Sequence, residues 1–198
     1  MNNYEYIIAC LPDLRRDGTA IDVPAVMDSI VSQCSKADRK LVDFILEGFG
    51  DDSLDEDFYR RALSHKDRFI REYFAYDLDV RNAKVDFLNA SLGRPAGQDT
   101  MFPTRYEEYA FDDRDKVNAI LNGKDILERE RGLDGLMWER IDDITRMDVF
   151  NIDVILAFMA KLQITGRWLK LDEQTGRELF RKLVADIRQT YDNKKNNI

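Results

Sequence analysis

The stretch DRFIREYFAYDLDVRNAKVDFLNASL, residues 67–92, decides the fold class of this chain. One apolar row runs through it in alternating steps of four and three residues: Phe69, Tyr73, Tyr76, Val80, Ala83, Phe87 and Ala90. A second row lies beside the first: Ile70, Phe74, Leu78, Val85, Leu88 and Leu92. Such steps place side chains on one face of an α-helix, so the stretch predicts a long helix that is covered on two sides. We expect this helix in the middle of a bundle.

Capping residues mark the starts of further helices before this stretch. Asp22 and Ser35 each precede an apolar pattern of helical period, and both residue types are favoured N-caps. Ser53 and Glu56, three residues apart, have the spacing of a capping box. We expect that box to begin a helical segment that continues to residue 92, with a break near residues 64–65.

One long connection separates this helical half of the chain from a second one. Gly93, Pro95 and Gly97 interrupt the pattern, and residues 93–111 show no sustained period, which is typical of an irregular connection. Helical periodicity then returns over four predicted segments: residues 113–121, 125–147, 152–164 and 172–191. The sequence therefore predicts a mainly α protein, a bundle of about six or seven helices.

The first residues form an exception to the helical pattern. Residues 4–11 are rich in aromatic and β-branched side chains and are followed by Pro12, which favours a short strand or an extended arm. The candidate partner strand is 167–171, an alternating apolar and polar run after Gly166, a residue that commonly ends helices.

Length and charge limit the classes of function. The chain has 198 residues, 44% hydrophobic and 34% charged, enough for one helical domain over residues 1–198. The alternative division is two lobes, 1–92 and 112–198, joined by 93–111. A net charge of −8 without a basic cluster argues against nucleic acid and against an anionic membrane surface. The longest uninterrupted apolar run, residues 154–160, is too short to span a membrane, so we expect a cytoplasmic protein.

Motifs for catalysis, cofactors or metals are missing from the sequence. It contains no phosphate-binding loop, nucleophile elbow or zinc-protease motif, and its single histidine, His65, lies in a polar segment typical of a solvated turn. Cys10 and Cys34 lack metal-ligand spacing, and we expect both to be reduced and mostly buried. We therefore expect a non-catalytic protein with no catalytic residue, no cofactor and no bound metal. A hydrolase built on a pair of carboxylates remains the enzymatic alternative.

Residues 128–145 contain the least ordinary combination of side chains. Gly132 and Gly135 lie inside a strong helical pattern, where each costs up to about 1 kcal/mol relative to Ala, so we expect a close helix crossing there. Trp138 and Arg140 stand at the edge of the apolar stripe, as does Trp168 in a later segment. Aromatic and Arg residues dominate many interfaces, which makes these three candidate partner contacts, although burial in the core explains the tryptophans equally well.

Aromatic residues in the connection 93–111 are a second group of candidate contacts. Phe102, Tyr106, Tyr109 and Phe111 make this segment too apolar for a disordered linker. A two-fold interface between copies of the chain, with these residues as anchors, is one interpretation.

Several segments together resemble an uncharacterised bacterial family of unknown function: residues 4–14, 69–74, 131–145, 150–164, 167–172 and 176–183. Members of that family tend to be encoded beside V-type ATP synthase subunits. The resemblance implies a link to that assembly and a distant likeness to its C (d-type) subunit, the helical socket between the central shaft and the membrane ring. It carries no catalytic or ligand residues with it, because the family has none assigned.

The resemblance and the sequence together lead to one functional hypothesis. We expect a non-catalytic component or assembly factor of a V-type ATP synthase, acting through contacts with its subunits and peripheral to the membrane only through that complex. A stand-alone homo-oligomeric helical interaction protein is the alternative, since it also needs an exposed apolar face.

Overall fold

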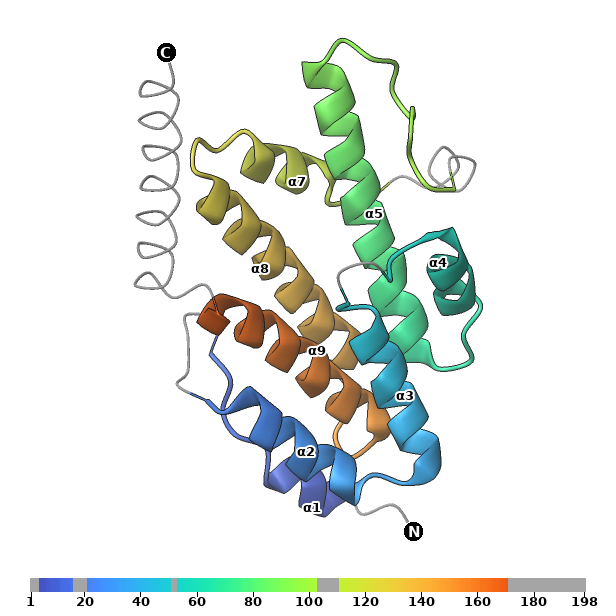
Figure 1. Cartoon of the computed structure of the whole chain (residues 1–198), viewed down its shortest axis with the longest axis vertical. Coiled ribbons are helices and arrows are strands. Elements are labelled where there is room, and N and C mark those ends of the chain that lie inside the picture. Colours follow the sequence, from blue (N-terminus) through green and yellow to red (C-terminus); the bar gives the residue numbers. More distant parts are fainter. Residues whose placement is uncertain (1–3, 16–20, 51–52, 103–110, 171–198) are drawn as a thin grey trace, which may run out of the picture.

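A computed structural model describes residues 4–15, 21–50, 53–102 and 111–170 of the chain (Figure 1). These residues form eight α-helices and no strand, which confirms the mainly α fold. The helices are α1 (Tyr4–Ala9), α2 (Val23–Gln33), α3 (Lys36–Glu47), α4 (Glu56–Leu63), α5 (Arg68–Ser91), α7 (Arg114–Leu121), α8 (Ile126–Thr145) and α9 (Ile152–Lys170). The predicted helix 172–191 lies outside the described residues.

Side-chain caps begin the N-terminal helices, largely where the sequence predicts them. Asp22 Oδ1 accepts a hydrogen bond from the Ala25 N–H at 3.0 Å, which confirms this residue as the cap of α2. Ser35 is likewise confirmed as the cap of α3. The predicted break is also present, because α4 ends at Leu63 and a new helix begins at Arg68. Each cap satisfies a backbone N–H that has no partner within the helix.

The predicted capping box is wrong. The cap of α4 is Asp55, whose carboxylate accepts a hydrogen bond from the Phe58 N–H at 2.8 Å. Ser53 instead donates its hydroxyl to the carbonyl of Gly50 at 3.0 Å and to that of Glu47. The Ser53 side chain therefore closes the turn after α3 and is not available to α4.

The predicted N-terminal strand and its partner strand are also wrong. Residues 4–9 form helix α1, and residues 167–170 are the last turn of α9, which continues past its predicted end at 164. Gly166 does not stop this helix. It is buried, and a Cβ atom there would lie 3.3 Å from a methyl group of Val23. The glycine lets α2 approach α9 closely, so its role is packing.

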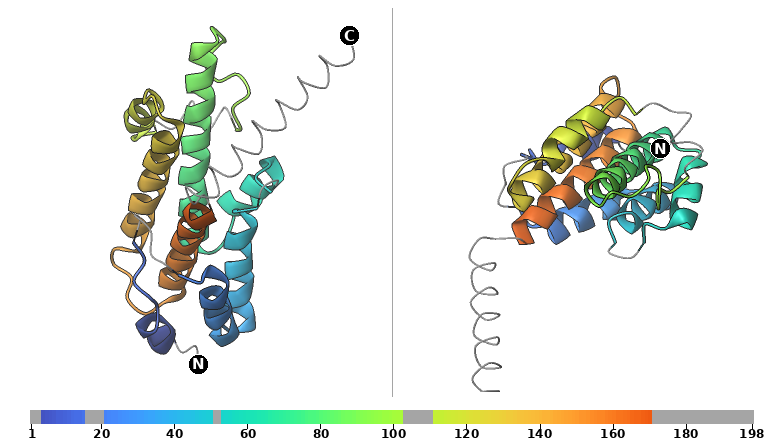
Figure 2. Two further views of the ribbon diagram at one scale, coloured as in Figure 1. Left: turned by 60° about the vertical axis from the view of Figure 1, so that its left-hand side comes forward. Right: turned by 90° about the horizontal axis from the view of Figure 1, so that it is seen from above.

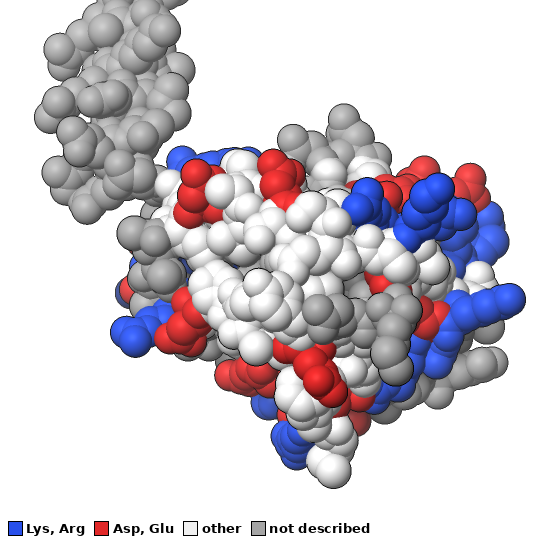
Figure 3. Space-filling view, turned by 90° about the horizontal axis from the view of Figure 1, so that it is seen from below, with Lys and Arg blue, Asp and Glu red and all other residues white. Residues whose placement is uncertain are grey.

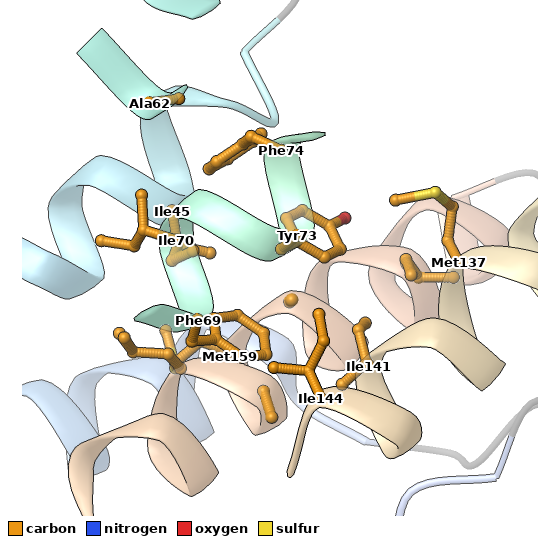
Figure 4. Close-up of a cluster of buried hydrophobic side chains, with 14 of the residues drawn as sticks. Ile45, Ala62, Phe69, Ile70, Tyr73, Phe74, Met137, Ile141, Ile144 and Met159 are labelled. Carbon is orange, nitrogen blue, oxygen red and sulfur yellow. The ribbon is translucent and has the colours of Figure 1, made fainter. Parts of the chain in front are cut away.

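Two helices, α5 and α9, form the centre of the bundle. Helix α5 packs against α3, α4, α7, α8 and α9, and α9 also packs against α1, α2, α3 and α8 (Figures 1 and 2). Figure 4 shows side chains of this core from α5, α8 and α9, among them Phe69, Tyr73, Ile141 and Met159. Helices from both sides of the connection 93–111 therefore share one apolar core.

The two apolar rows of α5 are covered over only part of their length. Residues up to Ala83 are mostly buried, but Leu88 and Leu92 are 56% and 63% exposed. The last turns of α5 extend beyond the other described helices (Figure 2). Polar side chains in the second half of α5 hold the segment that follows the helix. Asn82 exchanges two hydrogen bonds with the backbone of Met101, at 2.9 and 3.0 Å, and Asn89 donates to the carbonyl of Gln98 at 2.6 Å.

Candidate protein-contact site

The two predicted tryptophan contacts lie along the seam between α8 and α9. Trp138 and Trp168 are both half-buried and pack against the core. A cation covers each ring: Lys161 Nζ lies 4.7 Å from the centroid of Trp138, and the Arg131 guanidinium lies 5.0 Å from that of Trp168. Cation–π contacts of this kind hold the rings in place within the chain.

A buried carboxylate fixes Trp168 further. Asp134 accepts a hydrogen bond from the Trp168 indole N–H at 2.7 Å and another from Arg167. A buried carboxylate is stable only when it is paired, so this cluster supports the packing of the last turns of α9 against α8. The polar edge of Trp168 is thus occupied within the chain, and its role in a partner contact stays a prediction.

Arg140 lies apart from the tryptophans. It is two residues beyond Trp138, which turns its side chain about 200° around the helix. Arg140 Nη2 is 4.0 Å from a carboxylate oxygen of Glu72, and its guanidinium is 5.6 Å from the ring centroid of Tyr76. Tyr76 in turn donates its hydroxyl to Asp113 at 2.8 Å. Burial and this hydrogen bond raise the pKa of Tyr76. Arg140 therefore belongs to a junction of α5, α7 and α8.

The aromatic anchors of the connection 93–111 divide between surface and core. Phe102 is half-buried and packs against the core. Phe111, predicted as an interface anchor, is buried beside Tyr76, with 5.5 Å between the ring centroids, so its ring is not available to a second copy. Tyr106 and Tyr109 lie outside the described residues.

Among the described residues, the most exposed group of large apolar side chains lies where no pattern in the sequence predicted a contact. It lies in the turn between α8 and α9, residues 146–151, which we call the clasped turn. Met147 is 88% exposed, Val149 63% and Phe150 53%. The signal was present in the sequence, because turns are usually polar and this one, RMDVFN, carries three large apolar residues in six. Such side chains gathered on one turn are typical of a protein contact.

Hydrogen bonds and ion pairs hold the clasped turn rigidly. Arg68, at the start of α5, contacts the carboxylates of Asp148 and Asp153, the latter at 2.7 Å from Nη2. Asn151 donates its side-chain amide to Asp148 at 2.7 Å, and the Asp148 N–H bonds to the Thr145 carbonyl at 2.9 Å. Asp148 thus ties the middle of the turn to two other elements, and the three apolar side chains point outward from a fixed backbone.

Charged side chains of both signs lie beside the turn, where Arg68 contacts Asp148 and Asp153, and Arg146 pairs with Asp143. Burial raises the pKa of Asp153 and the hydrogen bond from Arg68 lowers it, while the nearby charges of Asp67 and Asp148 raise it further, so that its pKa lies above the ordinary value. The hydrogen bonds to Asp153 and Asp148 raise the pKa of Arg68. Figure 3 shows the end of the molecule where α1 and α2 lie, and there both acidic and basic side chains border a broad uncharged surface.

Other sites for chemistry have little support in the described part of the chain. His65 accepts a hydrogen bond at Nδ1 from the Asp67 N–H at 3.0 Å, and its ring lies 5.1 Å from that of Phe44 beside a shallow depression. No three His, Cys, Asp or Glu side chains gather as a metal site among the described residues. Cys34 is buried, as expected, whereas Cys10 is exposed because it follows the last turn of α1 on the surface.

Comparisons with known proteins match only the C-terminal part of the chain. Residues 109–191, less than half of the chain, match a family described as "Protein of unknown function (DUF2764)". This match is consistent with an uncharacterised family, and it includes the clasped turn. Curated proteins and solved structures contain no match to the chain. No helix in the described residues is both long and apolar enough to cross a membrane.

Proposed function

We propose that this chain is a non-catalytic component or assembly factor of a V-type ATP synthase or ATPase, acting through protein contacts. The assembly comes from the family resemblance of the sequence segments, and the match of residues 109–191 to a family of unknown function is compatible with it. The mode of action comes from the described surface, where large apolar side chains are exposed on a rigid turn.

The clasped turn is the observation that carries this proposal. Burying an exposed apolar side chain such as Phe150 against a partner stabilises a complex by roughly 25 cal/mol for each Å² removed from water. A flexible loop would lose conformational entropy on binding, which opposes association. Because Asp148 is already bonded to Arg68 and Asn151, the turn loses little further freedom when it binds.

The proposal is tested by a pull-down of the tagged full-length chain from the native membrane fraction, with subunits identified by mass. Recovery of V-type subunits in a fixed ratio supports a permanent component, and recovery of partly assembled complexes alone supports an assembly factor. Recovery of none contradicts the proposal. Light scattering that shows a multiple of the 23.2 kDa chain, with no V-type subunit recovered, would favour the homo-oligomeric alternative.

A matched pair of variants connects the pull-down to the site. The double variant Met147→Ser/Phe150→Ser removes one thioether and one aromatic side chain from the clasped turn. Recovery of subunits by this variant should fall at least tenfold. Ile126→Ser/Leu127→Ser is the control, because these residues are 73% and 54% exposed at the opposite end of α8. Equal losses from both variants would mean that the clasped turn is not the contact.

A further inference from the structure

We infer that residues 172–191 of this chain pack an apolar stripe onto the exposed start of α8, so that the chain covers this surface itself. This docking goes beyond the proposed function and concerns the chain alone, whichever assembly it belongs to. It withholds two large apolar side chains, Ile126 and Leu127, from other proteins.

The surface to be covered lies where α8 begins. Ile126 and Leu127 are the first two residues of this helix, and they are 73% and 54% exposed. The end of α9 lies on the same side of the molecule as the start of α8 (Figure 1). The two helices run in opposite directions, since Lys161 pairs with Asp142 on one side of the hairpin and Trp168 bonds to Asp134 on the other.

The described part of the chain ends close to this surface. The ring of Trp168 lies 5.0 Å from the Arg131 guanidinium, so the last turn of α9 lies against α8 near Arg131. Ile126 is five residues before Arg131, about 8 Å along the helix axis, and neighbouring helix axes are about 8–10 Å apart. The end of α9 is therefore about 12 Å from Ile126 by this geometry.

The segment that follows α9 carries an apolar stripe of matching reach. Its members have helical spacing in the sequence: Phe180, Leu183, Val184, Ile187 and Tyr191. In a helix that begins at Asp172, residue 180 lies about 12 Å from the start, which is the span to Ile126. A helix of this length gains most of its stability from packing of its apolar face, so the stripe needs a surface to cover.

The family match supports one unit made of these elements. It covers residues 109–191, so it begins shortly before α7 and ends at the last member of the stripe. Helices α7, α8 and α9 and the stripe are thus matched together. A segment that packs against the start of α8 is consistent with these limits.

The covalent connection favours this segment over a separate protein or a second copy. A short tether gives the segment an effective concentration of roughly millimolar at the surface, whereas another molecule must reach it from dilute solution. Association of two molecules also costs translational and rotational freedom, and stable interfaces bury about 800 Å² on each partner. The tethered segment has already lost most of that freedom, so two apolar side chains are enough to hold it.

Thiol labelling of the full-length chain tests this docking. A Leu127→Cys variant places a thiol on the covered surface, and a Leu88→Cys variant is the matched control, because Leu88 at the end of α5 is 56% exposed. Labelled peptides are identified by mass, which separates them from those of Cys10 and Cys34. The thiol at position 127 should react several-fold more slowly than the one at position 88. Equal rates would overturn the inference.

Variants in the segment link this protection to the stripe. Phe180→Glu/Val184→Glu places two charges in the stripe and should raise the labelling rate at position 127 to that at position 88. Ala185→Glu/Gln189→Glu adds the same charge on the opposite face of the predicted helix and should leave the rate low. The rate at position 88 should be the same in both backgrounds, which checks the fold. Equal effects of the two variants at position 127 contradict docking through the stripe.

Dilution distinguishes the tethered segment from a second copy. Protection within one chain does not depend on protein concentration, whereas protection by a second copy fades on dilution. Protection that is lost on dilution would therefore overturn the inference. Because the labelling uses the purified chain, it can fail while V-type subunits are recovered in the pull-down, and it can succeed when none are recovered.

Discussion

Two phenylalanines of α5 show how burial separates residues that have the same pattern in the sequence. Phe74 and Phe87 each belong to an apolar row of helical period. Phe74 is 1% exposed and lies with its ring centroid 4.8 Å from that of Phe58 in α4. Phe87 is only half-buried, since it comes after the part of α5 that α4 and α8 cover.

Truncating these rings should therefore have unequal effects on stability. We expect Phe74→Ala to lower the free energy of unfolding by about 3–5 kcal/mol, as for fully buried aromatic residues, and Phe87→Ala to lower it by less than about 2 kcal/mol. Urea unfolding of the two variants measures both values. Equal losses would show that the second half of α5 is covered as completely as the first.

The carboxylate of Asp134 is a second residue whose role depends on burial. We expect Asp134→Ala to lower the free energy of unfolding by about 1–3 kcal/mol, because Arg167 and the Trp168 indole lose their hydrogen-bond acceptor. Asp143→Ala is the matched control on the same helix, where an exposed ion pair with Arg146 is worth less than about 1 kcal/mol. A control variant as unstable as the Asp134 variant would contradict this role.

At the scale of helices, the crossing of α7 and α8 depends on a glycine. A Cβ atom at Gly132 would lie 2.8 Å from one side-chain carbon of Ile120 and 3.2 Å from another, which is too close for van der Waals contact. The expectation of a close helix crossing at this glycine is therefore confirmed. The close approach offsets the low helix propensity of glycine.

The effect of Gly132→Ala on the free energy of unfolding should depend on the side chain at position 120. Gly132→Ala alone should destabilise the protein by about 1–2 kcal/mol, because the clash outweighs the gain in helix propensity. In an Ile120→Ala background the clash is absent, and the same change should be neutral or stabilising. A double-mutant cycle of unfolding free energies measures this coupling, and additive effects would contradict it.

At the scale of the whole molecule, buried tyrosines make stability sensitive to alkaline pH. Burial is the main cause that raises the pKa of Tyr59 and Tyr73 above the ordinary value of 10.0, and the charge of Asp77 raises it further. Both phenols stay protonated in the folded chain at pH values where the unfolded chain has lost those protons. Their contribution to stability is complete below pH 10 and is lost as the pH rises above it.

The resulting slope can be measured. Above about pH 10, each of these two tyrosines should lower the free energy of unfolding by about 1.4 kcal/mol per pH unit. Urea unfolding at about pH 9 and pH 11 gives the total slope, and a Tyr59→Phe variant should show a smaller one. An unchanged slope in that variant would show that Tyr59 ionises as readily in the folded chain as in the unfolded chain.

The sequence by itself determined the helical class, most helix boundaries and two of the N-caps, because these depend on local spacing and on side chains such as Asp22 and Ser35 that act within one turn. The tertiary structure decided the rest. It gave Gly166 a packing role, covered only the first half of the α5 rows, and paired Trp168 with Asp134. It also joined Arg68 to Asp148, 80 residues away, and so tied down a short turn that exposes large apolar side chains. Contacts between distant residues depend on how the helices pack together. Periodicity along the chain shows which face of a helix is apolar, but it does not show which other helix covers that face.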